Sequence, residues 1–325
     1  MKRRDFIELM SWVGASTALK PAFAQRPLKL IVWINAFPFA PERPFPTRFL
    51  KGMQELGYVD GRDFAYAERG GNGIEDAAWV TEEAIQLKAD IIIASSTLEA
   101  VAAKNATSTI PIICPALADA VHLGLIASES RPGGNVTGIE PYVGGLPAKQ
   151  IELAREIVPG ATRIGLLTNN LDPKGVPQVA ELKAAGQALD LKIISANADR
   201  PEEIEAALQA LAKEKVDVTI VVQTSLFLVH RLAIARAALQ KRLPTVFGYR
   251  EHVSDRGLIS YGVDLRWCYH RAAYFAVKIL QGGNSRDLPI EFPTSFWLAV
   301  NLRTAKQLEI SVPSSLLARA DEVIE

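Results

Sequence analysis

Residues 89–97 read ADIIIASST, and this stretch indicates the fold class of the chain. Its three consecutive isoleucines, Ile91 to Ile93, do not alternate with polar residues, which is typical of a strand buried on both faces of a parallel sheet. Small hydroxyl residues follow directly, and residues 97–105 have the pattern of a helix. A buried strand that turns directly into a helix predicts a βαβ unit.

The same alternation continues on both sides of this stretch. Before it, we expect strands at 28–34 and 63–67 and helices at 48–56 and 75–88, and after it a strand at 110–114. Residues 141–146 are rich in Gly and Pro and suit a crossover between two halves. The pattern then repeats, with strands at 163–167, 191–195, 216–222, 245–247 and 258–261 and helices at 176–189, 202–213 and 228–241. We therefore predict an α/β protein with two doubly wound lobes, each built on a parallel sheet.

The C-terminal segment has a different pattern. A long helix is expected at 267–281, an extended segment at 289–300, a helix at 302–308 and a final short helix from Pro313 to the end. One extra helix and one extra strand are what the chain needs to return to the first lobe and then to the second. Several crossovers between two lobes form a hinge architecture.

The N-terminus carries the pattern of an export signal. Residues 1–24 run from the basic start Lys2-Arg3-Arg4 through an apolar stretch to Ala22-Phe23-Ala24, so a signal peptide is predicted. The alternative, a buried N-terminal helix, fits less well with the short apolar run and with the small residues that follow it. Arg3-Arg4-Asp5-Phe6-Ile7 also resembles the twin-arginine signal, with Lys2 in place of the usual Ser or Thr. No Cys follows that could carry a lipid, so we expect a periplasmic protein that begins near Gln25.

Charge and hydropathy exclude several classes of partner. The chain has 36 Lys and Arg and 36 Asp and Glu; removal of residues 1–24 leaves 32 and 34, a net charge of −2. This balance argues against nucleic acid or an anionic membrane as partner. No second apolar run approaches 20 residues, so a membrane-embedded protein is not expected, and we expect a monomer.

The sequence lacks the common signatures of metal sites and enzymes. It has two cysteines, Cys114 and Cys268, which we interpret as small buried side chains, although an oxidising compartment would permit a disulfide between them. There is no C-x-x-C, no H-E-x-x-H, no G-x-S-x-G and no P-loop, so we predict no metal, no cofactor and no enzymatic activity. Ser96, His122 and Asp119 include the residue types of a catalytic triad, but nothing in the sequence orders them.

Five motifs resemble those of a known family over essentially the whole chain. They are residues 55–62 (ELGYVDGR), 131–138 (RPGGNVTG), 244–251 (PTVFGYRE), 261–265 (YGVDL) and 313–324 (PSSLLARADEVI). Together they resemble the ABC-transporter substrate-binding proteins of the tryptophan- and phenylalanine-binding type. The resemblance implies a type I periplasmic-binding-protein fold, with 27–139 plus 265–291 in one lobe and 140–264 plus 292–325 in the other. It also implies closure on a small ligand and docking on a membrane permease with its ATPase.

Polar residues follow several predicted strands of the first lobe. Ligands of open α/β sheets bind at the carboxyl ends of the strands. Ser95, Ser96 and Thr97 stand there at the start of a helix, where hydroxyls and free N–H groups suit a carboxylate, although helix capping would use them as well. Asp119 follows the strand at 110–114 and either accepts from a ligand ammonium group or caps the next helix. Phe37, after the first strand, is a candidate for the wall of the cleft.

The second lobe offers a matching set. Asn169 and Asn170 follow the strand at 163–167, and an amide side chain both donates and accepts, which suits a zwitterion. Thr224 follows the strand at 216–222. Tyr249 and Tyr261 follow further strand ends, where an aromatic ring can stack on an apolar ligand. Each aromatic taken singly is more often a core or rim residue.

The sequence departs from the family pattern at the predicted cleft. Relatives usually have Gly and Pro around residues 96–98 and Asp-Pro where this chain has Asp119-Ala120, and residues 35–46 are unusually rich in Pro and Phe. The resemblance implies an amino acid or related metabolite as ligand, an aromatic one included, and these departures favour a bulkier or more apolar one. A sensor subunit that presents its ligand to a membrane receptor is the alternative function, and a periplasmic enzyme is a weaker one.

Overall fold

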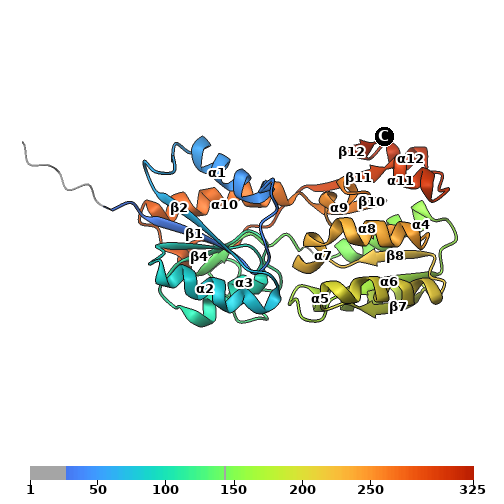
Figure 1. The fold of residues 1–325 in the computed structure, drawn as a ribbon, viewed down its shortest axis with the longest axis horizontal. Coiled ribbons are helices and arrows are strands. Elements are labelled where there is room, and N and C mark those ends of the chain that lie inside the picture. Colours follow the sequence, from blue (N-terminus) through green and yellow to red (C-terminus); the bar gives the residue numbers. More distant parts are fainter. Residues whose placement is uncertain (1–26, 143) are drawn as a thin grey trace, which may run out of the picture.

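The chain forms two α/β lobes, which lie side by side along the long axis of the computed structural model (Figure 1). The structure describes residues 27–142 and 144–325, so the predicted signal peptide at 1–24 lies outside the described residues. One lobe is built on a five-stranded sheet and the other on a seven-stranded sheet. The predicted fold class, two α/β lobes with parallel sheets, is confirmed.

The first lobe has an entirely parallel sheet of strand order β2-β1-β3-β4-β5. Its strands are β1 (Leu30–Asn35), β2 (Ala65–Gly70), β3 (Ile91–Ala94), β4 (Ile112–Cys114) and β5 (Val136–Gly138). Its helices are α1 (Pro44–Glu55), α2 (Ala77–Gln86), α3 (Thr97–Ala106) and α10 (Leu265–Leu280), with 3-10 turns at Ile74–Asp76 and Ser285–Asp287. Alternate residues of β1 face opposite sides, so Ile31 and Trp33 join one apolar cluster and Val32 and Ile34 the other.

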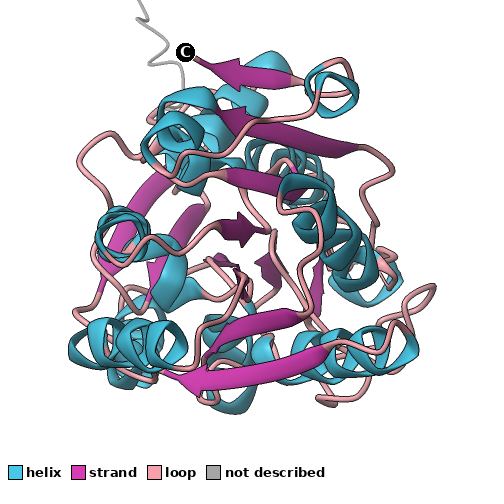
Figure 2. Ribbon diagram, turned by 90° about the vertical axis from the view of Figure 1, so that its right-hand side faces the viewer, coloured by secondary structure: helices cyan, strands magenta, loops and turns pink. Residues whose placement is uncertain are grey.

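The second lobe has a mixed sheet of order β12-β11-β10-β9-β8-β6-β7. Its strands are β6 (Arg163–Thr168), β7 (Lys192–Asn197), β8 (Val218–Val221), β9 (Thr245–Phe247), β10 (Ile259–Val263), β11 (Phe296–Asn301) and β12 (Glu322–Ile324). Its helices are α4 (Leu146–Ile157), α5 (Gly175–Ala188), α6 (Ile204–Lys213), α7 (Ser225–Val229), α8 (Arg231–Gln240), α9 (Arg250–Ser254), α11 (Leu302–Gln307) and α12 (Ser314–Leu317), with a 3-10 turn at Pro201–Glu203. Figure 2, which looks from the side of this lobe, shows helices flanking its strands.

The end of the chain differs from the sequence-based expectation in two ways. β11 runs antiparallel to β10, so this sheet is not wholly parallel. The helix expected from Pro313 to the end stops at Leu317, and residues 322–324 form an edge strand that pairs with β11. The cause is the apolar pair Val323 and Ile324, which extends the sheet beside Val300 and Asn301.

The long helix α10 returns to the first lobe and packs on α1. The approach is close at Gly52, where a Cβ atom would lie 2.5 Å from the carbonyl oxygen of His270, so only glycine fits without a shift of the helix. Tyr269 of α10 stacks on Trp33 of β1, with ring centroids 5.4 Å apart, and on Phe45 at 4.3 Å. The first lobe therefore depends on a helix from far along the chain.

Three chain segments connect the lobes, at 139–145, 263–265 and 288–296. The first and third pair with each other in a short parallel bridge between Ile139 and Glu291, and Glu140 N–H donates to the Glu291 carbonyl at 2.9 Å. Arg271 of α10 holds the Glu291 carboxylate with two hydrogen bonds, of 2.7 and 2.8 Å.

Both cysteines are buried and free. Cys114 belongs to the apolar cluster that includes Val32, and Cys268 to the cluster on the opposite face of the sheet, so they contribute packing rather than a disulfide. Among the described residues, no helix combines the length and the apolar character needed to cross a membrane.

Candidate functional site

The space between the lobes contains two cavities lined from both sides. The larger, of about 520 Å³, has Trp33, Phe37 and Ser96 from the first lobe and Ser225 and Tyr249 from the second among its lining residues. The smaller, of about 250 Å³, also has Phe37 in its lining. Binding sites for small molecules usually measure about 300–1,000 Å³, so the larger cavity is the better candidate.

A chain of hydrogen bonds crosses between the lobes beside these cavities. The Lys174 ammonium donates to Ser225 Oγ at 3.3 Å, Ser225 Oγ donates to Ser96 Oγ at 3.0 Å, and Ser96 Oγ donates to Glu99 Oε2 at 2.7 Å. It begins at the Lys174 ammonium and ends at the Glu99 carboxyl group, and all the links lie in buried or part-buried surroundings. Because hydrogen bonds that involve a charged group are stronger than neutral ones, this chain stabilises the contact between the two lobes.

The start of α3 is occupied by the protein's own carboxylate. Ser96 is the N-cap, and Glu99, three residues on, accepts from the Ser96 N–H at 2.9 Å and from the Ala36 N–H at 2.8 Å. This is a capping box, in which the cap and the third helical residue satisfy each other. Burial raises the pKa of the Glu99 carboxyl, against the opposing effects of these hydrogen bonds and of Lys174. The carboxylate site predicted for a ligand at Ser95 to Thr97 is therefore largely filled from within.

Asp172 plays the matching part in the second lobe. Its carboxylate accepts from the Ser225 N–H at 2.8 Å and from the Lys174 N–H at 3.0 Å. The Lys174 ammonium lies 4.0 Å from the same carboxylate, and the two side chains are only 6% and 2% exposed. The two lobes thus meet through one buried cation and two buried carboxylates, those of Asp172 and Glu99.

Six aromatic side chains contribute to the walls of the larger cavity. Trp33 Nε1 donates to Ser95 Oγ at 2.5 Å, and the Tyr269 hydroxyl donates to the Ser95 carbonyl at 2.8 Å, so both rings are held in place. The segment rich in Pro and Phe, residues 37–46, forms another wall. Tyr249 approaches from the second lobe, and burial raises the pKa of its hydroxyl, which stays protonated.

Two titratable groups of α9 have strongly shifted pKa values. Burial raises the pKa of Glu251, which borders the larger cavity, to about 7. Burial lowers the pKa of His252, whose ring stacks on Phe247 with centroids 4.5 Å apart, to about 3. The imidazole is therefore neutral at physiological pH, and its Nε2 is buried with no hydrogen-bond partner among the described residues.

The neutral state of His252 predicts a loss of stability in acid. Between pH 6.5, the usual pKa of an unfolded His, and about pH 3, only the unfolded chain binds the proton, so unfolding becomes more favourable as the pH falls. We expect the wild type to lose about 1.4 kcal/mol per pH unit in this range relative to His252→Phe, which cannot titrate. Urea denaturation of both proteins at several pH values measures the difference, and parallel pH profiles would contradict it. Glu251 is present in both proteins, so its own titration largely cancels.

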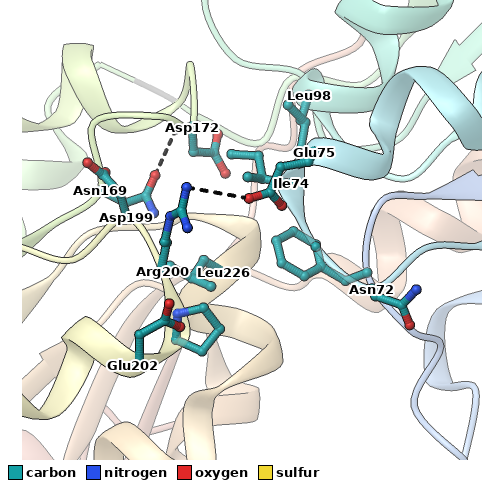
Figure 3. A pocket seen from close by; sticks show the side chains of 13 residues that line it. Asn72, Ile74, Glu75, Leu98, Asn169, Asp172, Asp199, Arg200, Glu202 and Leu226 are labelled. Carbon is teal, nitrogen blue, oxygen red and sulfur yellow. Dashed lines mark hydrogen bonds and ion pairs between the residues drawn. The ribbon is translucent and has the colours of Figure 1, made fainter.

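The smaller cavity is the more polar of the two, and Figure 3 shows the side chains that line it. Ile74, Leu98 and Leu226 contribute to its apolar lining. Across it, Arg200 of the second lobe lies 3.9 Å from Glu75 of the first, but both side chains are more than half exposed. An exposed ion pair of this kind contributes little free energy.

The structure brings half of the sequence-predicted residues to the cavities. Ser95, Ser96 and Tyr249 line the larger one, Asn169 lines the smaller one, and Phe37 lines both. Asn169 is also tied to its own lobe, because its side chain donates to the Ala198 carbonyl at 3.0 Å and accepts from the Asp172 N–H at 2.7 Å.

The other five predicted residues line neither cavity. Thr97 donates to the Ala116 carbonyl, Thr224 caps α7, Asn170 is exposed, and Tyr261 stacks on Phe296. Asp119 has a positive φ of 53°, and its N–H donates to Glu140 Oε1 at 2.6 Å. The segment after it forms turns, so it does not cap a helix.

Sequence reasoning did not select Trp33, Lys174, Glu251 or Tyr269, all of which line the larger cavity. Ser225, which also lines it, directly follows the predicted Thr224 at the same strand end. Lys174 stands six residues past the end of β6, and Glu251 lies inside a short helix. Neither has a local sequence signal that separates it from a surface charge.

Comparison with known proteins gives concordant results. A family model described as ABC transporter substrate binding protein matches residues 47–324. The chain is 28% identical over 266 residues to a tyrosine-binding protein of Clostridioides difficile, covering 81% of this chain and 75% of that protein. The two-lobed fold is shared with type I periplasmic binding proteins.

Two solved structures differ in how well they superpose. The ABC domain of a Streptococcus pneumoniae protein in complex with L-Trp has a TM-score of 0.85 at 21% identity, covering 91% of this chain and 100% of that one. A substrate-binding protein with adhesive properties from Clostridium difficile, in its ligand-free, open form, has a TM-score of 0.66 at 25% identity, covering 91% and 99%.

Proposed function

Because this chain belongs to the ABC transporter substrate-binding protein family, we propose that it is the ligand-capturing component of an importer. It takes up a small organic ligand between its two lobes by hinge closure and delivers it to a membrane permease driven by an ATPase. The family works outside the cytoplasm, which agrees with the export signal proposed at residues 1–24 and with a periplasmic location.

The observation that carries this proposal is the pair of cavities lined by both lobes, with the Lys174–Ser225–Ser96–Glu99 chain of hydrogen bonds beside them. A ligand enclosed in this way contacts both lobes at once and so biases an open–closed equilibrium towards closure. The moving bodies that we propose are residues 27–139 with 265–291 and residues 140–264 with 292–325.

The two comparison structures support a closed arrangement of the lobes in this protein. The ligand-free open protein has the higher sequence identity of the two, yet it superposes less well than the L-Trp complex. A difference in the angle between the lobes lowers a TM-score without any change of fold. A tyrosine-binding relative and an L-Trp complex suggest a ligand with an aromatic body.

Locking the lobes together tests hinge closure. Ser96 Oγ and Ser225 Oγ are 3.0 Å apart, so cysteines at both positions are close enough to form a disulfide between the lobes after a small adjustment. We expect the oxidised Ser96→Cys/Ser225→Cys protein to lose ligand binding, because the ligand enters only when the lobes separate. Reduction of the disulfide should restore binding, as measured by calorimetry before and after addition of reductant.

The single variants Ser96→Cys and Ser225→Cys serve as controls for the loss of each hydroxyl. Cys114 and Cys268 are buried and so do not compete for the new cysteines. Binding by the oxidised double variant at the wild-type rate would show that ligand enters without opening, and hinge closure would have to be abandoned.

A further inference from the structure

The larger cavity has walls suited to an apolar body but contains few free polar groups. Its aromatic lining comes from Trp33, Phe37, Phe39, Phe45, Tyr249 and Tyr269. Aromatic faces attract both apolar surfaces and organic cations. The charge of the ligand therefore depends on which charged residues of the lining lack a partner.

Each cation that lines this cavity already has an acidic partner. Arg43 pairs with Glu68, Arg231 pairs with Asp255 at 2.6 Å, and the Lys174 ammonium lies 4.0 Å from Asp172. A ligand carboxylate would have to displace one of these partners. Displacement would leave a protein carboxylate unpaired, which is costly wherever that carboxylate is buried.

Backbone N–H groups do not offer a free anion site either. Glu99 accepts from the Ser96 N–H at the start of α3, and Asp172 accepts from the Ser225 N–H at the start of α7. A ligand carboxylate placed there would face two buried carboxylates. The centre of the cleft therefore disfavours anions on both sides.

One carboxylate in the lining has a buried oxygen with no partner among the described residues. Glu251 Oε2 is buried and makes no hydrogen bond to any described residue, and no ion pair joins this side chain to a described cation. The charged groups that face it are Asp264 before α10, Arg250 on its own helix and Arg231 on α8. The two arginines are already paired, with Glu322 and Asp255 respectively.

We infer that the ligand is an amine with an aromatic or other bulky apolar body and no carboxylate, and that Glu251 binds its ammonium group. This inference rests on the proposed function and specifies the chemical class of the ligand. The relatives suggest an amino acid instead. An amino acid fits this cleft less well, because the positions that would receive its carboxylate are filled by Glu99 and Asp172.

Three compounds that share an indole ring and differ only in charge test the inference. They are tryptamine, which carries the amine alone, L-tryptophan, which carries both groups, and indole-3-propionate, which carries the carboxylate alone. In calorimetry with the wild-type protein lacking residues 1–24, at pH 8, we expect tryptamine to bind about tenfold or more tightly than L-tryptophan, and no binding of indole-3-propionate.

The outcomes separate this inference from the proposed function. Equal or tighter binding of L-tryptophan would overturn the amine assignment and leave a solute-binding role supported. Binding of indole-3-propionate would overturn it in the same way. Failure of all three to bind would also overturn the assignment.

A matched pair of variants tests the part of Glu251. Glu251→Gln should weaken tryptamine binding about tenfold or more, while Glu82→Gln, which changes an exposed carboxylate of α2 that lines neither cavity, should stay within about twofold. Circular dichroism and a melting curve establish that each variant is folded, and Glu251→Asp, which keeps the charge, should retain part of the affinity. Equal effects of Glu251→Gln and Glu82→Gln would contradict the assignment.

The pH dependence gives a second measurement. Because burial raises the pKa of Glu251 to about 7, its charge is lost as the pH falls from 8 to 6, while the ligand amine stays protonated. Tryptamine binding should weaken over this range in the wild type and in Glu82→Gln but not in Glu251→Gln. A similar pH profile for all three proteins would overturn the role of Glu251.

Discussion

Asp172→Ala is expected to lower the free energy of unfolding by about 3–5 kcal/mol. The lost carboxylate accepts hydrogen bonds from the N–H groups of Ser225 and Lys174 and lies 4.0 Å from the Lys174 ammonium. All of these groups are in buried or part-buried surroundings, so the substitution leaves a buried cation without its counter-charge. Removal of one partner of a buried ion pair is much more costly than removal of both.

Urea denaturation of the wild type and Asp172→Ala measures this effect. Glu202→Ala is the matched control, because Glu202 also lines the smaller cavity but is exposed, and we expect a change within about 0.5 kcal/mol. The double variant Asp172→Ala/Lys174→Met should recover part of the loss, since it removes the unpaired cation. If Asp172→Ala were as mild as Glu202→Ala, the buried charges would not stabilise the junction of the lobes.

Gly262→Ala is expected to destabilise the second lobe by about 3 kcal/mol, because the added methyl group has no room. A Cβ atom at Gly262 would lie 1.9 Å from the carbonyl oxygen of Gly248 and 3.0 Å from Gln223 Nε2. The backbone has little freedom to move away, since β10 pairs with β9 just before this point and Gln223 Nε2 donates to the same carbonyl at 3.0 Å. The stored strain should lower the melting temperature by roughly 6–12 °C.

Gly144→Ala provides the comparison for this substitution. Gly144 is exposed, and an added Cβ would meet nothing within 4 Å, so its melting temperature should change little. Differential scanning calorimetry of both variants gives the two values under the same conditions. A small effect at Gly262 would mean that β9 and β10 separate easily.

Much of the fold was predictable because the buried strands carry strong local signals. The isoleucines of β3 are apolar on both faces, and the observed strand, Ile91–Ala94, lies within the stretch predicted at 89–94. Strand β5 and helix α4 lie in or beside a segment rich in Gly and Pro, and neither was predicted. β5 is only three residues long, and α4 begins with a proline near its first position, where the missing N–H is tolerated.

The site was less predictable, because its chemistry depends on contacts between distant residues. The Ser96–Glu99 capping box is visible in the sequence as S-x-x-E, and it indicates that the start of α3 is already occupied. No comparable signal links Lys174 to Ser225, 51 residues away, or Ser225 to Ser96, 129 residues away. Strand ends locate the edge of a sheet, but tertiary packing decides which side chains there face the cleft.

The return of α10 to the first lobe affects how the protein folds while it is being synthesised. Strands β1 to β5 are complete at Gly138, but the apolar cluster that contains Trp33 and Phe49 is covered by residues of α10, which begins at Leu265. At about 5–20 residues per second, the ribosome needs roughly 6–25 s to make the intervening segment. During this time one face of the nascent lobe has no cover of its own. The second lobe has its strands β6 to β10 in one continuous stretch, so its central sheet is available for folding before the first lobe is finished.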